Sequence, residues 1–301
     1  MASTSTDANT DKMNEIEKAQ TNLLDLPPEI SQAIIHELVA IVRPGKPLKM
    51  RLTCRAFARD ILHEYCFYFP WTYDKLRRYE GFAEHNMSSI LYNKTKHLAG
   101  AHPDLPNKII AMADWISHEQ GWITNKERDY CVQLLCNMIA RTHSSSETTA
   151  MLYGDRNRKD FAYYVWTSEW FDAAQAPLNA SDKLAAAAMM GNASLVKPLM
   201  SDFRRMDRHQ VFGDGLHIAA TTENLNFAQA VSDCLDSLKG EDSPNYEHLI
   251  SHMIHGGQNI GEQEGAWDDA AVAAMQHCKS TAMIKLLVDM CSKHSLLVFK
   301  K

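Results

Sequence analysis

The sequence lacks a long apolar run, a basic cluster and a regular cysteine pattern. No stretch approaches the roughly 18 to 20 apolar residues of a membrane span, and residues 1–20 have no apolar segment of a signal peptide. Basic residues occur in pairs at most, and the formal charge is −6, which argues against direct nucleic-acid binding. Seven scattered cysteines without a Cys-x-x-Cys pair predict reduced thiols in the cytoplasm or nucleus.

Motifs of common enzymes are also missing. His-Glu pairs begin at His36, His63 and His118, but no second His follows four residues later, as a zinc-protease helix requires. The segment 256–261 has phosphate-loop glycine spacing without the Lys-Ser/Thr that must follow, and there is no Gly-x-Ser-x-Gly elbow. We therefore expect a protein without catalysis or cofactor.

One histidine cluster keeps a metal site open as an alternative. His248, His252 and His255 share one face of an expected helix, and His277 and Cys278 could complete a zinc site. A solvated helix face explains the same spacing, and we prefer that interpretation.

The sequence does contain recurrent apolar spacing near 3.6 residues, with little alternation of period 2. The expected helices are 29–42, 108–118, 126–141, 182–190, 193–203, 216–222, 225–238, 246–255, 268–278 and 281–291. Turn-forming residues separate them at 43–47, 100–106, 142–149, 239–245 and 255–265. This predicts an all-α protein, either a globular bundle or a solenoid of helix hairpins, with helix over more than about half of the residues.

A repeat favours the solenoid. Residues 184–200 align with residues 216–232 at a constant offset of 32, which pairs Ala187-Ala188 with Ala219-Ala220. Small alanines let the first helix of each hairpin lie close to its neighbours, and larger side chains on the second helix then cover it. We expect these four alanines to be buried. Pro198 lies within an expected second helix, where it removes a hydrogen bond and costs up to about 3 kcal/mol unless the helix bends there.

This pattern resembles the ankyrin repeat, which reads Leu-His-x-Ala-Ala, a turn, and then an apolar second helix. "LHIAA" at 216–220 and "GNASLVKPLM" at 191–200 carry the resemblance. A weaker copy spans 272–288, with Ile284, Leu286 and Leu287 on its second helix, and 249–260 resembles the end of a further unit. A generic helical bundle with alanine-rich helices remains the alternative.

The N-terminal segment 23–65 resembles an F-box, which implies a small partner-binding unit of three helices. The residues that match are Leu26, Pro27, Glu29, Ile30, Ile34 and Leu38, followed by Leu48, Arg51, Leu52, Cys54, Arg55 and Phe57. We expect Pro27-Pro28 to begin a helix, and Leu52, Cys54 and Phe57 to pack against a stripe of Ile30, Ile34 and Leu38. The resemblance implies that Leu26, Pro27, Ile30, Ile34 and Leu38 bind the Skp-type linker subunit of a cullin ubiquitin ligase. A structural alternative is that the segment only covers the end of the solenoid.

The two resemblances cover about half of the chain. Their combination resembles a fungal family with an N-terminal F-box-like segment and C-terminal ankyrin repeats. The expected organisation is a disordered tail over 1–20, an F-box-like unit over 21–66, an irregular helical region over 67–180 and ankyrin-like repeats over 181–295. The function implied is an interaction adaptor that recruits a ubiquitin ligase and holds a client protein. The alternative is a nuclear ankyrin coregulator that binds a transcription factor, for example for a fungal specialised-metabolite gene cluster. Neither involves direct nucleic-acid binding or a membrane.

Overall fold

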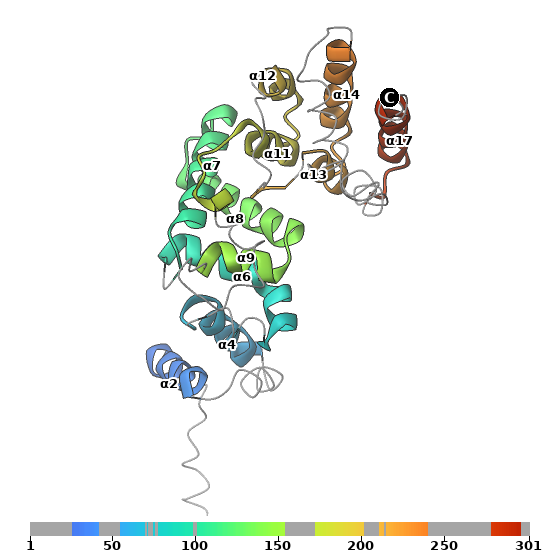
Figure 1. Cartoon of the computed structure of the whole chain (residues 1–301). Helices are drawn as coiled ribbons and strands as arrows, with labels where there is room; N and C mark the ends of the chain where they lie inside the picture. Colours follow the sequence, from blue (N-terminus) through green and yellow to red (C-terminus); the bar gives the residue numbers. More distant parts are fainter. Residues whose placement is uncertain are drawn as a thin grey trace, which may run out of the picture. The chain divides into compact units, whose positions relative to one another are not determined.

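The computed structural model is helical throughout the part of the chain that it describes. Those residues are 26–41, 55–69, 71, 75, 78–98, 101–153, 172–201, 211–213, 215–239 and 278–295, and they contain α-helices and a 3-10 turn but no strand (Figure 1). The expected all-α class is confirmed. The chain divides into two compact units, Met1–Phe69 and Pro70–Lys301. None of the described helices has both the length and the apolarity that a membrane span needs.

In the described part of the first unit, two helices pack on each other, α2 (Pro28–Ile41) and α4 (Arg55–Phe67). The carbonyl of Pro27 accepts from the N–H groups of Ile30 and Ser31 at 3.0 and 3.1 Å. The helix therefore begins at the proline pair, as expected, because the N–H that proline lacks has no intrahelical acceptor there.

Four described helices of the second unit pack on one another, α6 (Glu80–His97), α7 (Asp104–Gln120), α8 (Asn125–Thr142) and α9 (Ser145–Tyr153). Two expected turns are only partly right here, since α7 begins inside 100–106 and α9 begins inside 142–149. The cause at α9 is a capping box. Ser144 Oγ accepts from the N–H of Glu147 at 3.2 Å, and the Glu147 carboxylate accepts from the N–H of Ser144 at 2.8 Å. The polar run therefore starts a helix.

Two helix hairpins follow, as the repeat predicts. The first comprises α11 (Ala180–Met190), a 3-10 turn η3 (Ala193–Leu195) and α12 (Val196–Ser201), and the second comprises α13 (Gly215–Thr221) and α14 (Leu225–Lys239). Helix α11 packs on α13 and α12 packs on α14 (Figure 1). The alanines at 187, 188, 219 and 220 are all buried, which confirms their expected place.

The backbone repeats at the same offset as the sequence. The N–H of Asn192 donates to Ala187 O at 2.9 Å, and 32 residues later the N–H of Asn224 donates to Ala219 O at 2.8 Å. The preceding residues, Gly191 and Glu223, both have left-handed φ angles, of 67° and 57°. This geometry is that of the Schellman motif, and it ends both first helices in the same way.

The turn between α7 and α8 repeats the motif in a region where the sequence shows no clear repeat. Gly121 has a φ of 67°, and the N–H of Trp122 donates to Ser117 O at 2.8 Å. Helix α7 also packs on α11. The helix–turn–helix geometry of the repeats thus has a counterpart on the N-terminal side of α11.

The last described helix, α17 (Thr281–Ser295), packs on α14 with Met283, Leu287 and Met290 buried. It corresponds to the second helix expected for the weaker repeat copy. The expected helices 246–255 and 268–278 lie outside the described residues, apart from Cys278. Pro198 is in the first turn of α12, where its missing N–H disturbs no intrahelical bond, so the helix begins near the proline instead of bending at it.

Candidate functional site

Helix α2 leaves two isoleucines on its surface. Ile30 is 50% exposed and Ile34 is 41% exposed, whereas Ile35 and Val39 are buried. Pro27 is exposed, and Leu26 and Leu38 are half-buried. The buried face of α2 is therefore turned by one residue, or about 100°, from the expected stripe.

The expected partner stripe of the second submotif is only partly described. Phe57 is half-buried on α4, while Leu48, Arg51, Leu52 and Cys54 lie outside the described residues. The residues of α4 that are buried include Ile61 and Tyr65. Packing of the unit thus uses one side of α2, and Ile30, Ile34 and Leu38 follow one another at intervals of four along another side.

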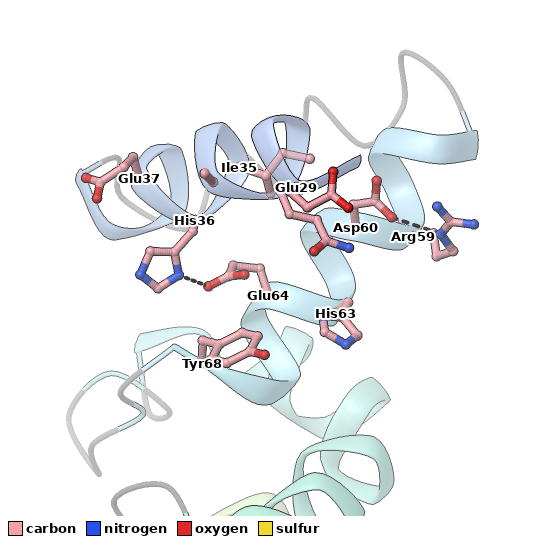
Figure 2. Close-up of a pocket in the computed structure, with 11 residues that line it drawn as sticks. Glu29, Ile35, His36, Glu37, Arg59, Asp60, His63, Glu64 and Tyr68 are labelled. Carbon is pink, nitrogen blue, oxygen red and sulfur yellow. Dashed lines mark hydrogen bonds and ion pairs between the residues drawn. The ribbon is translucent and has the colours of Figure 1, made fainter. Parts of the chain in front are cut away.

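A groove of about 530 Å³ lies between α2 and α4 (Figure 2). Helix α2 lines it with Glu29, His36 and Glu37 among others, and α4 lines it with Asp60, His63 and Glu64. Tyr68, in the turn after α4, also lines the groove. All of its walls belong to the first unit.

A hydrogen bond across the groove joins His36 to Glu64. His36 Nδ1 lies 2.5 Å from Glu64 Oε1, and the glutamate side chain is 9% exposed while the histidine side chain is 53% exposed. The bond holds a carboxylate that would otherwise be buried without a partner, at a cost of several kcal/mol. It also fixes the direction of the imidazole ring.

Aromatic rings gather near this bond. The ring of Tyr68 meets that of His36 edge-on at 6.0 Å between centroids and lies 5.9 Å from that of His63. His63 also stacks on Phe67 at 4.1 Å. Carboxylates and the rings of His36, His63 and Tyr68 therefore line one groove.

The sequence does not indicate that His36 bonds to Glu64. His36 and His63 each precede a glutamate, an arrangement that resembles part of a zinc-protease motif within one helix. The structure instead joins His36 of the first pair to Glu64 of the second, 28 residues further along. No local spacing reveals such a bond, because it depends on how α2 lies on α4.

The histidine cluster proposed as a metal site lies outside the described residues, except for Cys278. That thiol is buried and donates to Ser280 O at 3.6 Å. Within the described ranges, no three His, Cys, Asp or Glu side chains are grouped so as to hold a metal ion.

No protein-family model, no curated protein and no solved structure matches this chain. Function is therefore inferred from the residues and their geometry.

Proposed function

We propose that this protein is a non-catalytic interaction adaptor. Its F-box-like end binds the Skp-type linker subunit of a cullin ubiquitin ligase through α2, and its ankyrin-like helix hairpins bind a client protein. The observation that carries the proposal is the exposure of Ile30 and Ile34 on a helix that already packs on α4 by its other side.

The exposed stripe is suited to protein binding because of its regularity. Ile30, Ile34 and the half-buried Leu38 lie one above another on α2, and Pro27 extends the stripe at its start. Adjacent exposed apolar residues of this kind mark interaction surfaces more often than isolated ones do. The F-box resemblance of the sequence assigns the same residues to partner binding.

The hairpins support the second half of the proposal. Helices α11 to α14 stack at a constant offset with small residues between them, and stacked repeats form extended surfaces on which variable side chains bind other proteins. Specificity for the client depends on those surface side chains and not on the fold.

A capture experiment tests the ligase end. The full chain is mixed with purified Skp-type linker subunit, and binding is measured for the parent protein and for Ile30→Asp/Ile34→Asp. Charges on the stripe should abolish capture, because they would have to be buried at the interface. Ile123→Asp is the matched control, since Ile123 is exposed in the turn between α7 and α8. Failure of the parent to bind, or unchanged binding by the double variant, contradicts the proposal and favours the coregulator alternative.

A further inference from the structure

The groove between α2 and α4 is a second candidate binding site, separate from the exposed stripe of α2. Ile30 and Ile34 do not line it. We propose that the groove binds an arginine side chain in a peptide segment of a partner protein. This inference does not depend on ligase binding, because the two surfaces use different residues of α2.

The groove is rich in acidic side chains. Among its described lining residues, four are acidic, namely Glu29, Glu37, Asp60 and Glu64, and one, Arg59, carries a permanent positive charge. Arg59 is 80% exposed and its Nε donates to Asp60 Oδ1 at 2.8 Å. Within the described part of the chain, Glu29 and Glu37 make no ion pair. The groove is therefore negative and complementary to a cation.

Aromatic rings lie beside these carboxylates. Tyr68 is 57% exposed, and the rings of His36 and His63 lie within about 6 Å of its centroid. A guanidinium group can pair with a carboxylate through two parallel N–H bonds and stack on an aromatic ring at the same time. An ammonium group cannot make the paired bonds, which favours arginine over lysine.

The groove is larger than a single side chain. About 530 Å³ lies within the range of ligand-binding pockets and exceeds what one side chain fills. Its lining side chains come from both α2 and α4, as Figure 2 shows. There is room for the arginine and for the peptide backbone that carries it, so we assign a segment of a protein as the occupant.

The test uses the full chain and the tripeptide acetyl-Gly-Arg-Gly-amide, with the citrulline tripeptide as the neutral isostere. Binding is measured by calorimetry, and the imidazole resonances of His36 and His63 are followed by NMR. The citrulline peptide should bind about tenfold more weakly, which corresponds to the loss of a hydrogen bond between charged groups. The arginine peptide should shift both histidine resonances.

Two groove variants locate the site. Glu29→Gln/Asp60→Asn and, separately, Glu64→Gln should each weaken arginine-peptide binding about tenfold. Asp289→Asn, at an exposed carboxylate on α17, is the control and should bind like the parent. Since Glu64 is buried and bonded to His36, Glu64→Gln could impair folding, and the Glu29→Gln/Asp60→Asn variant keeps the test decisive in that event.

Several outcomes overturn the proposal. These are the absence of peptide binding, equal binding of the citrulline peptide, unchanged binding by Glu29→Gln/Asp60→Asn, and equal weakening by the Asp289 control. Free arginine amide that binds as tightly as the tripeptide would also overturn it, because the groove would then be a site for small cations.

Discussion

At the scale of single residues, alanine side chains determine how closely two hairpins approach. Ala219 on α13 is fully buried, and α13 packs on α11. Ala219→Leu should overpack this contact and lower the free energy of unfolding by about 1 to 3 kcal/mol. Urea denaturation measures the change, with Ala282→Leu at an exposed position of α17 as the control. An unchanged midpoint for Ala219→Leu would show that the hairpins do not pack through these alanines.

A second residue-scale prediction concerns the pH dependence of stability. Asp129 on α8 forms an ion pair with Lys96 of α6 and accepts from the hydroxyl of Tyr92 at 2.8 Å. Its pKa is lowered, chiefly by the hydrogen bond from Lys96, and burial together with the bond to Asp129 raises the pKa of Tyr92 to about 12. The lowered pKa means that the cluster favours the ionised aspartate, and the raised pKa keeps Tyr92 protonated as its hydrogen-bond donor.

The sign of the effect follows from the lowered pKa. The folded state holds the Asp129 proton less tightly than the unfolded chain, so the stabilisation is complete above the unfolded pKa near 3.9 and is lost as pH falls through the lower folded value. Asp129→Asn should therefore reduce the free energy of unfolding at pH 7, by less than about 1 kcal/mol for this partly exposed pair. The deficit should shrink as the pH falls below the unfolded value. Asp289→Asn should show no such pattern, and a deficit independent of pH would assign the loss to packing.

At the scale of elements, a buried ion pair joins α7 to the first repeat hairpin. Lys108 Nζ lies 2.9 Å from Asp182 Oδ2 and donates to Ala173 O at 2.7 Å, and the two side chains are 4% and 0% exposed. Asp182 also belongs to the capping box that begins α11. The same carboxylate thus starts one helix and ties it to another.

Removal of the cation should be costly. Lys108→Met keeps most of the apolar stem but leaves a buried carboxylate without its charge partner, which typically costs about 3 to 5 kcal/mol. Lys126→Met, at an exposed position of α8, is the matched control. Urea denaturation of both variants at pH 7 provides the comparison. Equal midpoints for the two would mean that the pair contributes nothing to holding α7 and α11 together.

Elements with a strong local pattern could be predicted from the sequence, and others could not. The alanine-rich helices α11 and α13 stand out because their repeat is written in consecutive residues. Helix α9 does not, since its buried positions include Thr148 and Thr149, whose hydroxyls donate to the backbone carbonyls of Ser144 and Ser145 at 3.1 and 2.5 Å. A threonine satisfied in this way is compatible with a core but looks polar in a sequence. Helix α6 is similar, because Asn93, Lys94 and Thr95 are buried on it.

The groove was beyond sequence reasoning for a different reason. Its histidine and glutamate come from separate helices, so neither spacing nor composition indicates that His36 meets Glu64. The exposed stripe of α2 could be listed from the F-box resemblance, but the side of the helix that packs on α4 could not. Ile34 and Ile35 are adjacent and chemically identical, and only tertiary packing decides which one is buried.

At the scale of the whole molecule, the first unit has two alternative roles. It binds another protein, or it only shields apolar surface of its own chain from water. The chain divides between Phe69 and Pro70 into two units, and α2 and α4 bury residues of their own, including Ile35 and Tyr65. If the unit binds another protein, Leu26 and Pro27 should contribute little to the stability of the isolated chain.

The double variant Leu26→Ala/Pro27→Ala separates these two roles. Pro27 is exposed and Leu26 is half-buried. If the unit binds another protein, the change should therefore abolish capture of the Skp-type subunit, while the unfolding midpoint stays near that of the parent. If the unit only shields apolar surface, Leu26 packs against that surface in the intact protein, and its truncation should cost about 2 to 5 kcal/mol. Thermal unfolding followed by circular dichroism and the capture assay, both on the full chain, give the two readouts. A large loss of stability, together with a parent protein that captures no linker subunit, would contradict the adaptor role, because α2 would then serve the fold alone.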